Sequence, residues 1–241
     1  MNLKNTSIQA IILAGGKGSR LSAIHPSIPK ALVPIEGKPF IQWQLEWLAA
    51  HGISSIHLAM GHLAEAILRW VESNPIHSIS ISSSSESYPS GTAGGLKSTE
   101  PFIISDPFLV INGDSLLPNL DFHKLISAHQ TNNSIITLAI TRIQSSARYG
   151  TVEFDHGGRI TAFQEKAERD EGWINSGVYV ARHDVFSHIP SDTIQSLETD
   201  IFPKLALTGQ LSAFKTPPPL LDMGTPEGMK VMESYLLSRE V

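Results

Sequence analysis

A largely apolar run from Ile8 to Leu13 leads directly into a short segment with three glycines, Gly15, Gly16 and Gly18. Such a run is typical of a strand buried on both faces, as in the centre of a parallel sheet. A glycine-rich turn at its end is typical of the passage from a strand to a helix. The sequence therefore predicts that the fold opens with a strand, a loop and a helix.

After this opening, segments with helix and strand character alternate. We predict helices over 39–52, 62–71 and 122–129, and strands over 53–60, 76–81, 108–111 and 135–140. This alternation is typical of βαβ units, in which helices cover both faces of a largely parallel sheet. The serine cluster from Ser82 to Ser85 is predicted to be a solvated loop that follows a strand.

Beyond Thr141 the pattern changes to short strands separated by glycine and charged residues. Strands are predicted over 151–154, 159–163, 174–180 and 211–214, and helices over 198–207 and 226–237. We interpret residues 1–241 as a single domain. Within it, residues 1–141 form the mainly nucleotide-binding portion and residues 142–241 the portion that binds the acceptor.

Charge and cysteine content exclude several classes of protein. The 241 residues include 18 Lys and Arg and 23 Asp and Glu, giving a formal net charge of −5, which argues against a nucleic-acid or anionic-membrane partner. The absence of cysteine excludes disulfides, thiolate zinc sites and cysteine nucleophiles. Gly15 and Gly16 interrupt the first apolar run before it could act as a signal peptide or membrane span, so we expect a cytoplasmic protein. The oligomeric state, a homo-oligomer included, is left open.

The clearest candidate for a binding site is the segment Leu13-Ala14-Gly15-Gly16-Lys17-Gly18-Ser19-Arg20-Leu21. Glycines without Cβ atoms let backbone amides approach and bind phosphate oxygens. The segment is neither a Walker loop nor a dinucleotide fingerprint, because Leu21 stands where the third glycine of the fingerprint would be. The alternative is a turn with a purely structural role.

Two cations follow this segment closely, Arg20 and Lys30, and Pro29 stiffens the backbone just before Lys30. Taken singly, each would be a solvated surface charge. Only 17% of the residues are charged, so the closeness of both cations to the glycines favours a role in binding phosphate groups.

Two aspartates are candidates for magnesium ligands. Asp114 closes the apolar strand over 108–111, and the carboxyl ends of strands are where ligands gather in parallel α/β sheets. Asp222 follows Leu220 and Leu221 in a similar way. Two carboxylates from distant segments could share one hard cation beside substrate phosphates. The alternative for each is an aspartate that stabilises a turn or caps a helix.

A third group of residues lies in the second half of the chain. Glu165 and Lys166 end a predicted strand, and Asn175-Ser176-Gly177 lies inside another, where a glycine is costly unless a ligand or another backbone comes close. This pattern indicates a pocket for the acceptor. A solvated surface ion pair is the alternative for Glu165 and Lys166.

Taken together, these segments resemble the sugar-1-phosphate nucleotidyltransferases, in order and over nearly the whole chain. The matching motifs are Leu13 to Leu21, Pro29-Lys30, Gly91-Thr92-Ala93-Gly94, Asn112-Gly113-Asp114, Tyr149-Gly150-Thr151-Val152, Glu165-Lys166, Asn175-Ser176-Gly177-Val178-Tyr179 and Asp222-Met223-Gly224-Thr225-Pro226. Ser19 replaces the threonine that is usual in the first motif.

The resemblance implies an α/β fold with a Rossmann-like mixed, mostly parallel sheet flanked by helices. Some members of the family append a C-terminal β-helix, which we do not expect here because few residues follow Asp222. The resemblance also implies that the phosphate of a sugar 1-phosphate attacks the α-phosphorus of a nucleoside triphosphate and releases pyrophosphate. The resemblance implies that three cations are catalytic, namely Arg20, Lys30 and Lys166. The residues that it implies bind the nucleotide are Leu13, Ala14, Gly15, Gly16, Lys17, Gly18, Ser19, Gly91, Thr92 and Asp114. The Mg²⁺ ligands that it implies are Asp114 and Asp222. It places Gly150, Glu165, Lys166 and Asn175 at the sugar phosphate.

Within the family, two segments resemble the D-glycero-α-D-manno-heptose 1-phosphate guanylyltransferases. They are Asn112-Gly113-Asp114-Ser115 and Ser196-Leu197-Glu198-Thr199-Asp200, and Glu198 is expected to contact sugar hydroxyls. Ala31 departs from this subgroup, which tends to have proline there. The alternatives are a mannose- or glucose-1-phosphate enzyme that uses GTP, UTP or dTTP, an inactive regulatory subunit that binds nucleotide sugars, and a glycosyltransferase, which would normally show a DxD motif.

Overall fold

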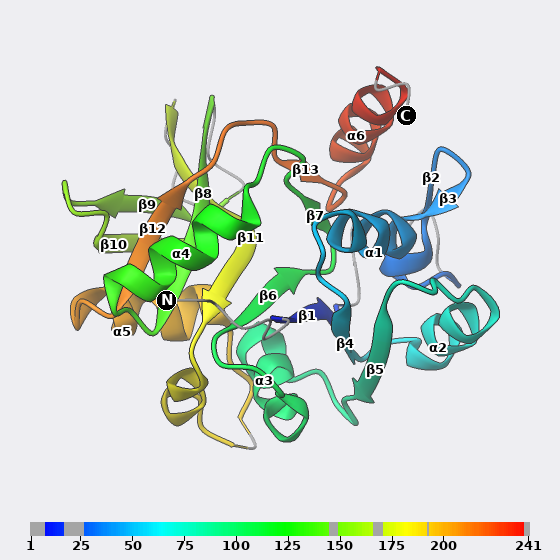
Figure 1. The fold of residues 1–241 in the computed structure, drawn as a ribbon, viewed down its shortest axis with the longest axis horizontal. Coiled ribbons are helices and arrows are strands. Elements are labelled where there is room, and N and C mark those ends of the chain that lie inside the picture. The colour runs from blue at the N-terminus through cyan, green and yellow to red at the C-terminus, as the bar shows by residue number, and fades with distance from the viewer. Residues whose placement is uncertain (1–7, 17–26, 145–148, 166–170, 192, 239–241) are drawn as a thin grey trace.

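The computed structural model describes residues 8–16, 27–144, 149–165, 171–191 and 193–238. Within these residues the main element is a mixed sheet of nine strands, with helices on both faces (Figure 1). One half is parallel and has the order β6 (Phe108–Asn112), β1 (Gln9–Ala14), β4 (Ser55–Met60) and β5 (Ser80–Ser85). The predicted α/β fold with a mixed sheet flanked by helices is confirmed.

The other half of the sheet is built around the long strand β11 (Glu171–Ala181), which runs antiparallel to β6 and to β8 (Ile136–Gln144). Beyond β11 lie β9 (Thr151–Phe154) and β10 (Ile160–Gln164), while β12 (Leu211–Lys215) pairs parallel with β8. A bridge between Arg159 and Ser212 connects the start of β10 with β12. The strands of the second half of the chain, β8 to β12, therefore pair with one another and join the parallel half of the sheet through β11 and β6.

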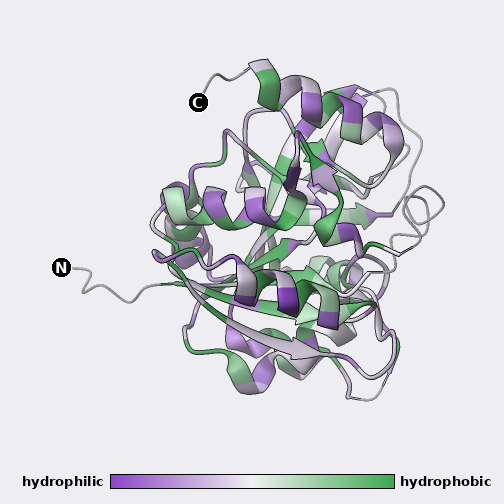
Figure 2. Cartoon of the chain, turned by 90° about the vertical axis from the view of Figure 1, so that its right-hand side faces the viewer, coloured by the Kyte–Doolittle hydropathy of each residue, from purple (hydrophilic) through white to green (hydrophobic). Residues whose placement is uncertain are grey.

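The first strand shows why the sheet is covered on both faces. Ile11 belongs to one hydrophobic cluster, whereas Ala10 and Ile12 belong to the other, because successive side chains of a strand point to opposite faces. On the Ile12 face lie α1 (Phe40–Ala50), α2 (Ala64–Ser73) and α4 (Phe122–Asn132). On the Ile11 face lie α3 (Gly91–Ser98) and α5 (Phe202–Leu207). Figure 2 shows hydrophilic and hydrophobic bands alternating along the helices, as expected for helices with one buried face.

A third hydrophobic cluster joins the C-terminal helix α6 (Pro226–Ser238) to the first half of the chain. Met232 of α6 packs in this cluster with Phe40, Leu116 and Leu221. Beside it are two short antiparallel ladders, β2 (Pro34–Ile35) with β3 (Lys38–Pro39), and β7 (Ser115–Leu116) with β13 (Leu221–Asp222). The second ladder brings the segments that contain Asp114 and Asp222 together.

Short helical turns complete the architecture. They are the 3₁₀ turns η1 (Lys30–Leu32), η2 (Glu100–Phe102) and η3 (His183–His188), and the π turn η4 (Leu197–Ile201), which leads into α5. In the part of the chain that the structure describes, no helix is long and apolar enough to span a membrane.

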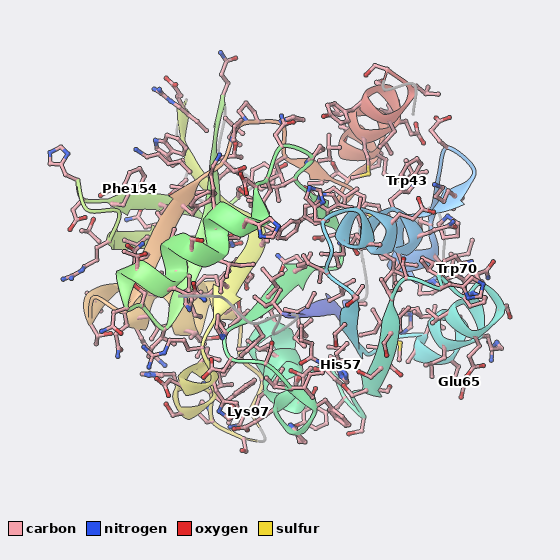
Figure 3. All side chains as sticks on the ribbon, in the orientation of Figure 1. Trp43, His57, Glu65, Trp70, Lys97 and Phe154 are labelled. Atoms are coloured by element: carbon pink, nitrogen blue, oxygen red, sulfur yellow. The ribbon has the colours of Figure 1, made fainter. Side chains whose placement is uncertain are left out.

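The serine cluster contradicts a prediction about local structure, and helix α3 is missing from the predicted elements. The serines from Ser82 to Ser85 belong to the edge strand β5 and not to a loop, because Ser82 and Ser84 hydrogen-bond the two ring nitrogens of the buried His57 on β4, each at 2.9 Å (His57 is labelled in Figure 3). Helix α3 was not predicted, since its glycines have low helix propensity. It forms because Ala93 and Leu96 are buried in the core of the Ile11 face.

Candidate active site

A cavity of about 290 Å³ opens at the carboxyl ends of β1 and β6. The predicted residues that line it come from four segments of the chain: Leu13 and Ala14 at the end of β1 with Gly15 and Gly16 just after it, Lys30 on η1, Gly91 and Thr92 on α3, and Asp114 after β6. Parallel α/β sheets place ligand sites at this edge, where the loops that follow neighbouring strands meet. The predicted nucleotide-binding residues Lys17, Gly18 and Ser19, and the predicted catalytic residue Arg20, lie outside the described residues.

The loops after β1 and β6 pack tightly against each other. The Gly113 amide donates a hydrogen bond of 3.0 Å to the carbonyl of Leu13. A Cβ at Gly113 would come within 2.6 Å of the same carbonyl oxygen, so a larger residue there would push the two loops apart. This close approach fixes Asp114 beside the glycine segment.

Lys30 and Asp114 form a direct ion pair across the cavity wall. The Nζ atom of Lys30 lies 2.5 Å from Oδ2 of Asp114, and the side chains retain 16% and 33% of their exposure. Burial raises the pKa of Asp114, but the positive charge of Lys30 and the hydrogen bonds from Lys30 and from the Ser115 hydroxyl lower it more, so the pKa lies below its ordinary value. Asp114 is therefore held as a carboxylate.

Asp222 lies beside Asp114 because β13 pairs with β7. Asp222 stands opposite Ser115 in this ladder, and the Met223 amide donates to the Asp114 carbonyl at 3.0 Å. One carboxylate oxygen of Asp222 accepts the Gly224 amide at 2.7 Å, and the other accepts the Tyr149 hydroxyl at 3.3 Å. The structure thus places both predicted metal ligands at the same edge of the sheet.

These two aspartates suit Mg²⁺ better than a cation that needs a full protein cage. Across the described ranges, no group of three or more His, Cys, Asp and Glu side chains is arranged to hold a metal. Mg²⁺ is usually bound by one or two carboxylates together with substrate phosphates and water. The ammonium group of Lys30 against Asp114 also shows that this carboxylate accommodates a cation.

The start of helix α3 is held by the segment before η4. Gly91 has a φ of +79°, and a Cβ there would lie 2.2 Å from the carbonyl oxygen of Gln195, so only glycine fits. The same carbonyl accepts the amides of Ala93 and Gly94. Thr92 donates to Glu198 Oε2 at 2.7 Å and accepts the Leu197 amide at 2.8 Å. Thr92, which is predicted to contact the nucleotide, and Glu198, which is predicted to contact the sugar, are therefore direct neighbours.

Glu86 also lines the cavity, although no sequence argument identified it. Its Oε1 accepts a hydrogen bond of 2.5 Å from Ser90. Its Oε2 lies 3.3 Å from the position that a Cβ on Gly15 would occupy. Glu86 directly follows β5, so it too stands at the carboxyl end of a parallel strand. A predicted strand that ended at Ser85 would have marked Glu86 as the residue at the carboxyl end of that strand, and so as a candidate for the site.

Three of the predicted sugar-phosphate residues, Gly150, Glu165 and Asn175, form a separate group outside the wall of this cavity. A Cβ on Gly150 would lie 3.0 Å from Glu165 Oε2, and the Asn175 amide donates to the Gly150 carbonyl at 2.8 Å, so the three are neighbours. The Asn175 side chain is engaged within the fold, because it donates to the Tyr179 hydroxyl and accepts the Gly177 amide. Lys166 lies outside the described residues.

Comparison with known proteins places this chain in a family. Residues 9–236 match the family described as Nucleotidyl transferase. The chain belongs to this family. This match, together with the similar proteins described next, confirms the resemblance to sugar-1-phosphate nucleotidyltransferases and the status of the protein as an enzyme of that class.

Individual members of the nucleotidyl transferase family are similar over most of the chain. The D-glycero-alpha-D-manno-heptose 1-phosphate guanylyltransferase of Aneurinibacillus thermoaerophilus is 33% identical over 95% of this chain and 98% of its own length. The protein of the same name from Campylobacter jejuni is 37% identical over 75% of this chain and 78% of its own length. The crystal structure of HddC from Yersinia pseudotuberculosis complexed with GMP-PN has a TM-score of 0.83 and 33% identity, and covers 95% of this chain and 99% of the other.

Proposed function

We propose that this nucleotidyl transferase uses GTP and a manno-configured heptose 1-phosphate to form a GDP-heptose and pyrophosphate. In the reaction, a phosphate oxygen of the sugar 1-phosphate bonds to the α-phosphorus of GTP, and the bond from that phosphorus to the pyrophosphate oxygen breaks. The observation that carries the choice of base is the carboxylate of Glu86 in the cavity wall.

The chemistry of Glu86 favours guanine over the other bases. An ionised carboxylate only accepts hydrogen bonds. Guanine offers two adjacent donors, N1–H and the N2 amino group, which match the two carboxylate oxygens. Uracil and thymine offer one N–H between two carbonyl oxygens, and adenine offers an amino group beside an acceptor. Each of these bases would place one of its acceptor atoms against an acceptor oxygen of the carboxylate. Two facing acceptors cannot form a hydrogen bond, so such a site disfavours these bases.

The remaining cavity residues suit the triphosphate. Backbone amides at Gly15 and Gly16 and the cation of Lys30 would bind phosphate oxygens and neutralise the charge that develops on the leaving pyrophosphate. Asp114 and Asp222 would hold Mg²⁺, which supplies charge neutralisation and orientation of the phosphates when bound. Arg20 and Lys166 would add charge at the triphosphate and at the sugar phosphate.

The choice of sugar is supported by the heptose enzymes among the similar proteins and by Glu198. Its carboxylate accepts from Thr92 and Ser196 through Oε2, an arrangement that fixes it beside Thr92, which lines the cavity. A carboxylate held in this way is a suitable acceptor for sugar hydroxyls. The grouping of Lys30, Asp114 and Asp222 also argues against an inactive regulatory subunit.

A pyrophosphate-release assay tests this proposal directly. The enzyme is supplied with heptose, mannose or glucose 1-phosphate, each combined with GTP, UTP, dTTP or ATP. We expect the highest kcat/KM for GTP with the manno-heptose 1-phosphate. A higher kcat/KM for mannose 1-phosphate would overturn the choice of sugar, and a preference for UTP or dTTP would overturn the choice of base.

A further inference from the structure

The ion pair between Lys30 and Asp114 joins two residues with separate proposed tasks, one at the phosphates and one at the metal. Nζ of Lys30 is 2.5 Å from Asp114 Oδ2, and Oδ1 of the same carboxylate accepts the Ser115 hydroxyl at 3.1 Å. The backbone around Lys30 is fixed, since Pro29 precedes it, the Leu32 amide donates to the Pro29 carbonyl and the Val33 amide donates to the Lys30 carbonyl. The fixed backbone thus holds the ammonium group of Lys30 against the carboxylate of Asp114.

A divalent cation at Asp114 would compete with this ammonium group. Both would be attracted to the same carboxylate, and two cations placed a few ångströms apart repel each other strongly in a partly buried site. Asp222, on the paired strand, accepts hydrogen bonds from the Gly224 amide and the Tyr149 hydroxyl. The ion pair with Lys30 places this competition directly at Asp114.

We propose that Lys30 is a built-in competitor of the metal at Asp114, and that a bound triphosphate relieves this competition by attracting Lys30 to its own oxygens. The inference rests on the proposed function, in which Asp114 and Asp222 hold the metal. Lys30 lines the same cavity as Gly15 and Gly16, so a phosphate held by these amides lies within reach of the lysine. Binding of the metal and of the triphosphate then favour each other, as linkage requires.

The consequence is that the metal alone binds weakly, and that removal of the lysine charge strengthens its binding. Hydrogen bonds to charged groups contribute about 1.5–3 kcal/mol, which corresponds to roughly a ten- to hundredfold change in affinity. A variant that lacks the ammonium group should therefore bind a divalent cation at least roughly tenfold more tightly than the original protein in the absence of nucleotide.

The experiment is a titration with Mn²⁺, without nucleotide, followed through the electron paramagnetic resonance signal of the free ion. Lys30→Met removes the charge and keeps the apolar stem, Lys30→Gln is measured beside it as a second neutral variant, and Lys30→Arg keeps the charge. We expect tighter binding in the two neutral variants and unchanged weak binding in Lys30→Arg. Adding Asp114→Asn to Lys30→Met should abolish the gain. Thermal unfolding of each variant checks that it is folded.

A matched control is Lys38→Met, which removes an ion pair of 2.7 Å with Glu46 away from the cavity and should leave Mn²⁺ binding unchanged. Equal or weaker Mn²⁺ binding in the neutral Lys30 variants, together with loss of binding in Asp114→Asn, would overturn the inference and leave the metal site intact. If Asp114→Asn changes Mn²⁺ binding in neither background, the metal site of the proposed function is itself wrong, and the inference falls with it.

Discussion

The substitution Glu86→Gln tests the proposed selectivity for guanine at one atom. Gln has the same size, and its carbonyl can still accept one hydrogen bond, but its amide group is a donor where the carboxylate has a second acceptor. In the structure Oε1 already accepts the Ser90 hydroxyl, so the Ser90 contact orients the side chain and Oε2 faces the cavity near Gly15. We expect the amide group to replace Oε2 and to meet a donor of guanine.

The expected magnitude follows from the loss of one charge-assisted hydrogen bond. Such bonds contribute about 1.5–3 kcal/mol, so kcat/KM for GTP should fall roughly ten- to hundredfold. The activity with UTP or dTTP should rise relative to GTP, because an amide pairs with the N3–H and a neighbouring carbonyl of these bases. The assay measures pyrophosphate release with each triphosphate at a saturating concentration of the sugar 1-phosphate.

Glu65→Gln is the matched control, since Glu65 lies on α2, its side chain is 88% exposed, and its contact is an ion pair of 3.5 Å with Arg69. It should leave the order of triphosphates unchanged. An unchanged kcat/KM for GTP in Glu86→Gln would refute the assignment of Glu86 to the base. A loss of equal size for all triphosphates would show that Glu86 supports the cavity without reading the base.

Three further predictions concern other parts of the structure. Asp114→Asn and Asp222→Asn should each reduce Mg²⁺-dependent turnover to background while circular dichroism and thermal unfolding show an intact fold, and near-normal turnover in either would remove that residue from the metal site. Glu198→Gln should lower kcat/KM for heptose 1-phosphate at least roughly tenfold at unchanged GTP affinity in a calorimetric titration, whereas weaker GTP binding would assign Glu198 to the nucleotide. Burial is the main cause that lowers the pKa of His129 from 6.5 to about 4 in the folded protein. Between these two pH values only the unfolded chain binds a proton at His129, so the free energy of unfolding should fall by up to about 3 kcal/mol as the pH drops from 7 to 4. Urea unfolding of the original protein and of His129→Gln measures this loss, which should be smaller in the variant.

The fold was largely predictable because each buried strand carries its own apolar pattern. The run from Ile8 to Leu13 and the strand over 108–111 need no tertiary contact to be recognised, and both lie in the sheet centre. The edge strand β5 differs, since four of its six residues are the serines Ser82 to Ser85, and their place in the sheet depends on pairing with β4 and on His57. Local sequence carries no signal for such contacts.

The candidate site was predictable where residues follow strands and unpredictable where contacts are long-range. Asp114 and Asp222 were expected to share a site because both follow apolar segments. The structure brings them together, since Asp222 lies on β13 and Asp114 directly precedes β7, the strand that pairs with β13. The contact of Lys30 with Asp114 spans 84 positions of the chain, and that of Thr92 with Glu198 spans 106. Such pairs depend on how α3, η1 and η4 pack, which neither periodicity nor spacing encodes.

The most direct test of the proposed function is a competition in a single reaction. The enzyme receives manno-heptose 1-phosphate and Mg²⁺ with GTP, UTP, dTTP and ATP at equal concentrations, and mass spectrometry measures the nucleotide sugars formed before a tenth of the substrate is consumed. The proposed function predicts that GDP-heptose exceeds every other product by at least roughly tenfold, the scale of one charge-assisted hydrogen bond to Glu86. A mixture of products in similar amounts, or an excess of the UDP- or dTDP-sugar, would contradict it.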